Sequence, residues 1–276
     1  MRRISYSHLA FAVLIAGLLA STTAFGASIV CPGNTPNPNA ANIALRVFND
    51  CPTATVTDFN SYPGQIVITN AGDDCFGGLN LHTWSFSTDG GASKAQFENC
   101  SYYHFCADVG LDGDGSGEGG LRLAPWWSPD ADGKFMLNVT TGEIACFGGR
   151  LPFYSFTVNF GITYVRGAFY HLDVVYNPHS LSSVDPATIT YMVKIGPNTY
   201  SSGPLPFDSG NLTEGPTYGL WGELTPAYAG GYFQQAGGNG VAQTLACTWM
   251  NICYENLGSP VPAEKSTWGK LKTLYR

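Results

Sequence analysis

Residues 170–176 have the sequence YHLDVVY, in which apolar side chains at every second position alternate with His171 and Asp173. Successive side chains of a β-strand point to opposite faces, so this pattern predicts one face in a core and one toward solvent. Residues 189–195 (ITYMVKI) and 154–160 (YSFTVNF) repeat the alternation. β-Branched and aromatic side chains also suit a pleated surface. These three stretches therefore predict half-buried strands.

Less regular stretches predict further strands at residues 65–69, 79–86, 135–139, 143–147 and 231–235. Turns rich in Gly, Asn and Asp separate the stretches, as tight hairpins require. We find no useful helical periodicity before the C-terminal tail and no repeat at a fixed spacing. Two antiparallel sheets packed face to face would bury all the apolar faces at once. We therefore expect an all-β, two-sheet antiparallel sandwich.

The composition fits such a domain and limits its partners. The chain has 276 residues, of which 44% are hydrophobic and only 12% charged, with 34 Gly and 17 Pro. This supports a sizeable core whose short segments are joined by many turns. The formal net charge of −7 argues against a nucleic-acid partner.

The first residues predict export. Arg2 and Arg3 precede an apolar stretch at residues 9–20, and small residues at 24 and 26 suit cleavage before Ala27. A retained membrane anchor, the alternative, requires about 18 apolar residues, and His8 shortens this stretch. No later stretch is long enough for a transmembrane segment, so we expect a secreted or cell-surface protein.

The chain divides into four parts. We expect a signal peptide at residues 1–26, an irregular Pro- and Asn-rich lead-in at 27–54, the β-sandwich at 55–258, and a linker with a basic aromatic tail at 259–276. Trp268, Leu271 and Tyr275 have helical spacing in this tail. It resembles short basic-aromatic tails of exported bacterial proteins, which suggests contact with an envelope or secretion component. An idle tail is the alternative.

Eight cysteines in an exported chain predict disulfides, because thiols oxidise and stay oxidised outside the cytoplasm. We predict the local pairs Cys100–Cys106 and Cys247–Cys253, with longer links among the other four. A zinc site built on Cys100, His104 and Cys106 is the alternative. The remaining cysteines are Cys31, Cys51, Cys75 and Cys146.

Residues 167–177 (GAFYHLDVVYN), 188–195 and 200–203 (YSSG) together resemble the central strands of laminin-G-like, concanavalin A-like jelly-roll sandwiches. The resemblance covers residues 58–255 and implies a jelly-roll sandwich. Similar folds include glycoside hydrolases and polysaccharide lyases, but strand and turn patterns indicate fold rather than activity.

A glycan-cleaving hydrolase or lyase is the minority hypothesis. Residues 231–235 (GYFQQ) resemble a strand of jelly-roll alginate lyases, yet the basic residue of that family and its Arg-x-Glu and Gln-x-His motifs are absent. No strand carries closely spaced acids for retaining hydrolysis. We assign no catalytic residue, and Glu143 and Glu223 would be the first alanine substitutions under this hypothesis.

Residues 108–118 (DVGLDGDGSGE) concentrate acids among small residues, which suits oxygen ligands around Ca²⁺. The stretch matches the first half of an EF-hand loop, but counting from Asp112 the twelfth position is Leu123 rather than Glu. A calcium site and an unliganded turn both stay open. The predicted metal ligands are Asp108, Asp112, Asp114 and Glu118.

Several aromatic residues are candidates for stacking on a ligand. Sugar CH groups pack on aromatic rings while carboxylates and amides bind the hydroxyl groups. We predict a secreted or cell-surface binding module for a glycan or other cell-surface polymer. A structural or adhesive protein without a small ligand, whose rings only pack the open end of the sandwich, is the alternative. The predicted ligand-binding residues are Tyr102, Tyr103, Trp126, Trp127, Trp221 and Tyr232.

Overall fold

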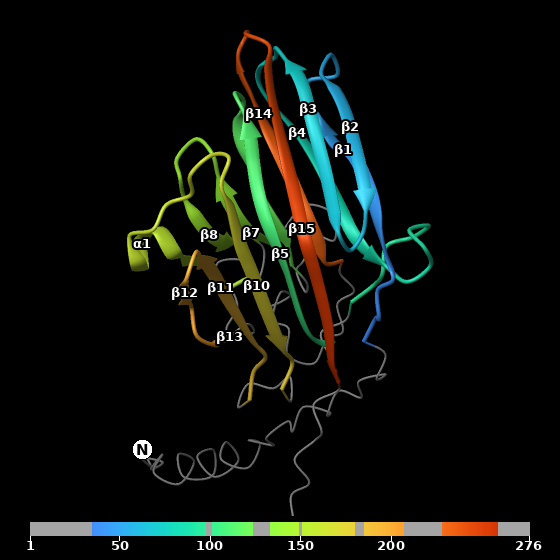
Figure 1. The fold of residues 1–276 in the computed structure, drawn as a ribbon, viewed down its shortest axis with the longest axis vertical. Helices are drawn as coiled ribbons and strands as arrows, with labels where there is room; N and C mark the ends of the chain where they lie inside the picture. The colour runs from blue at the N-terminus through green and yellow to red at the C-terminus, as the bar shows by residue number, and fades with distance from the viewer. Residues whose placement is uncertain are drawn as a thin grey trace, which may run out of the picture.

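A computed structural model describes residues 35–97, 101–123, 133–148, 151–179, 185–206 and 228–258. These residues form two antiparallel sheets packed face to face, with one short helix (Figure 1). The predicted disulfide-containing, two-sheet jelly-roll sandwich is confirmed. Predictions on residues outside these ranges concern the signal peptide 1–26, Cys31, Cys100, Trp126, Trp127, Trp221, Glu223 and the tail 259–276.

Sheet A contains seven described strands, and their spatial order differs from their order in the sequence. Strand β14, late in the sequence, lies between β4 and β6. In spatial order the strands are β1 (Ala40–Asn49), β4 (Phe76–Ser87), β14 (Gly230–Asn239), β6 (Ser116–Arg122), β7 (Lys134–Asn138), β8 (Ile144–Phe147) and β9 (Tyr154–Ser155).

Sheet B has the same mixed order, with the long C-terminal strand β15 between β5 and β3 (Figure 1). In spatial order its strands are β12 (Asn198–Ser201), β11 (Thr188–Ile195), β10 (Phe169–Asn177), β5 (Tyr102–Gly113), β15 (Gln243–Gly258), β3 (Gln65–Asp73) and β2 (Thr55–Ser61), and β13 (Leu205–Pro206) pairs with β11. Among the described residues, no helix is long and apolar enough to span a membrane.

The predicted apolar stripes form the core between the sheets. In β10, Leu172, Val174 and Tyr176 are fully buried, and β11 buries Ile189, Tyr191 and Val193 in the same way. Trp84 of β4 and Trp249 of β15 join the two layers, with ring centroids 6.1 Å apart in an edge-to-face arrangement. The less regular stretches are strands as well, namely β3, β4, β7, β8 and β14.

The strand predicted at residues 154–160 is wrong beyond its first two residues. Helix α1 (Phe156–Phe160) follows β9 directly. Ser155 caps this helix by accepting a hydrogen bond from the Val158 amide at 3.2 Å, and Gly161 ends it in the left-handed region at φ 69°. The alternation also places Phe156 and Phe160 four residues apart, where they stack on one side of a helix.

Residues 40–49 form a strand, although the sequence predicted that they belong to an irregular lead-in at residues 27–54. Strand β1 lies there at the edge of sheet A, with Ala41 opposite Phe86 of β4. Ala41 packs in the core, and Ile43 and Leu45 pack against it. Their alternation is weak in the sequence because alanine and asparagine fill many of the neighbouring positions.

The two predicted local disulfides are wrong, whereas Cys51–Cys75 is one of the longer links predicted among the other four cysteines. The structure pairs Cys51 with Cys75 and Cys106 with Cys253, with Cα atoms 5.6 and 5.0 Å apart. Cys106 and Cys253 are opposite each other on β5 and β15. The register of the two strands, and not the separation along the sequence, therefore determines which cysteines form the disulfide. Cys247 and Cys253 share one strand, about 20 Å apart. Because the Cys106 sulfur is bonded to Cys253, the zinc interpretation loses one ligand.

Cys146 and Cys247 are free thiols buried between the sheets, so the prediction that both form disulfides is wrong. Burial raises the pKa of both thiols well above the ordinary value, so little reactive thiolate forms. We expect neither cysteine to react with iodoacetamide in the folded protein and both to react in denaturant, as measured by peptide mass spectrometry. Labelling of either residue at the same rate in both conditions would contradict this packing.

Candidate functional site

The face of sheet A that points away from the core is itself partly buried. It carries a small second cluster of buried residues, namely Leu81, Met136, Ala145 and Tyr232, against which Val47 and Phe147 pack. One face of an antiparallel sheet is commonly solvated, with polar side chains there. The outer face of sheet A therefore carries apolar side chains that their neighbours shield from solvent.

An ion pair occupies the middle of this face. Lys134 Nζ of β7 lies 3.2 Å from Glu118 Oε1 of β6, and the two side chains are only 16% and 12% exposed. The Tyr232 hydroxyl of β14 lies 3.5 Å from the same Glu118 oxygen. Lys134 Nζ also lies 5.1 Å from the Tyr232 ring centroid and 5.8 Å from that of Phe147. We call Glu118, Lys134, Tyr232 and Phe147 the Glu118 cluster.

The order of strands explains why these side chains meet. Strands β14, β6 and β7 are neighbours in sheet A, and inward-pointing Leu121 and Phe135 leave Glu118, Lys134 and Tyr232 on the opposite side. Desolvation is the main cause that raises the pKa of the Tyr232 phenol well above its ordinary value, and the Glu118 charge adds to it. Tyr232 is therefore a neutral hydrogen-bond donor at physiological pH.

Further polar groups extend the cluster. Arg122, opposite Lys134 in register, places its guanidinium carbon 5.6 Å from the Tyr228 ring centroid. Lys94 Nζ approaches the same ring at 5.0 Å. On β4, the Thr83 and Ser85 hydroxyls are buried and have no hydrogen-bond partner within the described part of the chain. Buried hydroxyl groups without a partner call for water or a ligand.

Two predicted site residues meet here although they belonged to different predicted sites. Tyr232 was expected to stack on a sugar and Glu118 to bind a metal, and the structure brings them together. The other described aromatics lie elsewhere. Tyr102 is half-buried at the start of β5, whereas Tyr103 is fully buried in the core, with its ring centroid 5.1 Å from that of Phe97. Tyr103 faces inward because alternate residues of β5 line the core.

The four predicted calcium ligands do not converge. The segment that contains them leaves sheet B through β5 and enters sheet A through β6. Asp108 contacts His171 at 2.7 Å, Asp112 accepts the Gly113 amide at 2.9 Å, and Asp114 accepts the Thr244 amide at 2.7 Å. Glu118 pairs with Lys134 on the other sheet. Calcium binding as such stays a prediction.

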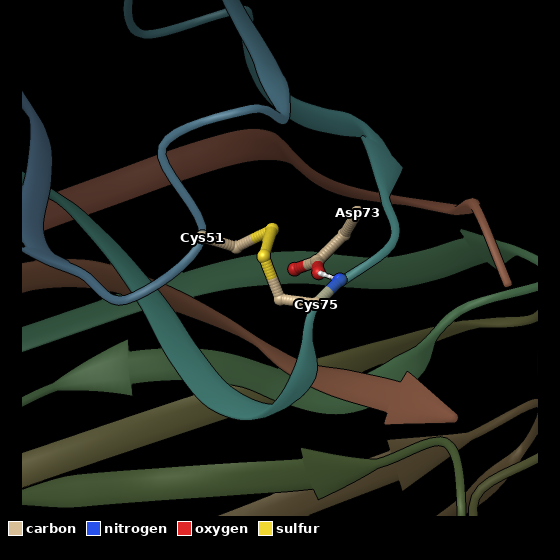
Figure 2. A group of neighbouring side chains, drawn as sticks. All are labelled: Cys51, Asp73 and Cys75. Atoms are coloured by element: carbon tan, nitrogen blue, oxygen red, sulfur yellow. Dashed lines mark hydrogen bonds between the residues drawn. A yellow bond between two sulfur atoms is a disulfide. The ribbon is translucent and has the colours of Figure 1, made fainter. Parts of the chain in front are cut away.

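One group of described residues has metal-ligand spacing, namely Cys51, Asp73 and Cys75 (Figure 2). Its two sulfur atoms form the disulfide, and Asp73 Oδ1 accepts a hydrogen bond from the Cys75 amide at 3.3 Å. A disulfide sulfur is not the thiolate that a metal requires. The group therefore fixes the chain between β3 and β4 in the folded protein.

A second polar cluster, which was not predicted from the sequence, lies on the outer face of sheet B. His104, His171 and Asp173 lie there within contact of one another. Two of its members, His171 and Asp173, form the polar side of the stretch YHLDVVY, and the alternation predicts only that this side faces solvent. The partner His104 could be found only from the pairing of β10 with β5.

The fold defines the chain as a two-sheet jelly-roll sandwich, and each of its two outer faces carries a polar cluster. The chain matches no protein-family model and no curated protein. Among solved structures it is similar to family 7 alginate lyase A1-II′ in complex with substrate, with 9% identity over 74% of this chain and 82% of that chain and a TM-score of 0.42.

It is also similar to the carbohydrate-binding module CBM66 from Bacillus subtilis, with 13% identity, 79% and 97% coverage and a TM-score of 0.39. A functionally unknown protein from Saccharomyces cerevisiae has 11% identity, 75% and 97% coverage and a TM-score of 0.33. With identities and scores this low, the similarities concern the arrangement of strands and carry no conclusion about a ligand.

Proposed function

We propose that the protein is a secreted or cell-surface glycan-binding module that holds its ligand on the outer face of sheet A. The observation that carries the proposal is the Glu118–Lys134 ion pair, which is largely withdrawn from solvent on a face that points away from the core. Removing charges from water is costly unless they are paired and hydrogen-bonded. Such an arrangement on an outer face fits a recognition site.

The chemistry of the face suits sugar hydroxyl groups. Glu118 accepts hydrogen bonds, Lys134 donates them, and Gln234 of β14 lies beside Glu118 in register. Phe48, opposite Leu81 on the same face, is 54% exposed and offers its ring to sugar CH groups. Polar groups that converge beside aromatic rings are typical of small-ligand sites.

The disulfides support the proposed location outside the reducing cytoplasm. Cys51–Cys75 and Cys106–Cys253 are the kind of cross-link that persists in oxidising compartments. They agree with the signal peptide predicted at residues 1–26.

Replacing Lys134 with alanine should weaken glycan binding about tenfold or more, because a charge-assisted hydrogen bond contributes about 1.5–3 kcal/mol. Wild-type protein is first screened on an array of neutral and acidic glycans, and the strongest ligand is then titrated by calorimetry. Lys194→Ala is the matched control, since it removes a lysine from sheet B, and we expect its affinity to be unchanged.

Glu118→Gln keeps the size of the side chain and should weaken binding as well. Equal affinities for Lys134→Ala, Lys194→Ala and wild type would contradict the proposed site. Binding of no glycan at millimolar concentration would contradict the proposed function. Release of shortened products from the same polysaccharides would contradict a role limited to binding.

A further inference from the structure

Five ionisable side chains form a row across the outer face of sheet B, in which carboxylates alternate with histidines. Three strands contribute them: β15, β5 and β10. We call them the His–Asp row, which consists in spatial order of Glu255, His104, Asp173, His171 and Asp108.

Each histidine of the row lies between two carboxylates. His104 Nε2 is 2.9 Å from Asp173 Oδ1, and its Nδ1 is 3.8 Å from Glu255 Oε2. His171 Nδ1 is 2.7 Å from Asp108 Oδ1, and its Nε2 is 3.8 Å from Asp173 Oδ2. Asp173, whose side chain is 8% exposed, is shared by both imidazoles.

Each imidazole makes one hydrogen bond to a carboxylate and one longer ion-pair contact, at 3.8 Å, with a second carboxylate. A neutral imidazole carries one N–H donor and one lone pair, so its lone pair would face one of the two carboxylates. An imidazolium is attracted to both. The positions of the carboxylates therefore match histidines that hold their second proton.

We propose that the His–Asp row is a proton-operated clasp, in which two imidazolium ions strengthen the attachment of β10 and β15 to β5 and stop doing so when they lose their protons. The backbone pairing of the strands and the Cys106–Cys253 disulfide keep them joined in either state. The clasp lies on the face opposite the Glu118 cluster and does not depend on the proposed glycan site. Of the other groups facing the row, Asn251 of β15 donates to Asp108 Oδ2 at 2.7 Å, and Lys194 of β11 lies opposite His171.

The shifts in pKa agree with this geometry. The hydrogen bond to Asp173 is the main cause that raises the pKa of His104, and it outweighs burial. The carboxylates of Asp173 and Asp108 raise the pKa of His171 against burial and the charge of Lys194. Burial works to raise the pKa of Asp173, but its contacts with both histidines outweigh burial and lower it to about 2.

The raised pKa values of the two histidines determine whether stability rises or falls with pH. A histidine whose pKa is raised by folding stabilises the fold fully below its unfolded value of 6.5. That stabilisation is lost as the pH rises through the higher value of the folded state. The clasp should therefore stabilise the fold in weakly acidic solution and lose this contribution in alkaline solution.

The direct test is an NMR titration of the His104 and His171 rings in the full chain. Both should titrate above pH 6.5, and Asp173→Asn should lower both values while Asp58→Asn, which removes an exposed carboxylate from β2, should leave them unchanged. Titration of either ring at or below pH 6.5 in the wild type would overturn the proposal, and this measurement needs no variant to fold.

A second readout concerns stability. The melting temperature of the wild type should fall between pH 6 and pH 8.5, roughly the range over which a raised histidine titrates. A His104→Gln/His171→Gln double variant should lose most of this dependence, and Asp58→Asn should keep it. An equal fall in the double variant and the wild type would overturn the clasp.

Discussion

Replacing Cys106 and Cys253 together with alanine is expected to lower the free energy of unfolding by about 5 kcal/mol. The two residues are 147 positions apart, so their disulfide restricts a very long loop of the unfolded chain. It also joins β5 to β15 in the middle of sheet B. Equilibrium unfolding in urea without reductant measures the loss.

The matched control is Cys51→Ala/Cys75→Ala. These cysteines are 24 positions apart, so the same chain-entropy argument predicts a smaller loss of about 3.5 kcal/mol. Both partners are replaced in each variant so that no new thiol is left to exchange with Cys146 or Cys247. A larger loss in the control would contradict the assignment, as would a disulfide-linked peptide that joins Cys247 to Cys253.

Replacing Gly120 with alanine is expected to cost about 3 kcal/mol of stability. Gly120 lies in β6 between Met136 of β7 and Tyr232 of β14. A methyl group there would collide with the backbone carbonyl oxygen of Phe135, and a backbone atom cannot rotate out of the way. Strand β7 would have to move away from β6.

The same substitution should disturb the Glu118 cluster, because β7 begins at Lys134. We expect weaker glycan binding together with lower stability, measured by calorimetry and by urea unfolding. Gly64→Ala is the control, since the nearest atom to its added methyl is the Ser61 carbonyl oxygen at 3.3 Å in a turn. It should cost about 1 kcal/mol or less. Equal stability of the two variants would contradict the close packing of β6 and β7.

Alternation of side chains was enough to predict the strands whose apolar residues face the core. The stretches that became β10 and β11 carry this signal without competing features. Residues 154–160 carry it too, but Ser155 and Gly161 supply the two caps of a short helix. Local hydrogen bonds therefore decided the structure of that segment against the alternation.

The Cys106–Cys253 disulfide and the candidate site could not be predicted because both depend on which strands are neighbours. Cys106 meets Cys253 only because β15 lies beside β5. Glu118 and Tyr232 were both singled out from the sequence, but their meeting with Lys134 requires the order β14, β6, β7. The sequence contains no local signal for that order.

The most direct test of the proposed binding face is to map the bound glycan on the wild-type protein. Amide chemical shifts are recorded by NMR while the strongest ligand from the glycan array is added. We predict that the largest changes fall on β14, β6 and β7 around Tyr232, Glu118 and Lys134. Changes confined to the outer face of sheet B, around His104 and Asp173, would contradict the account.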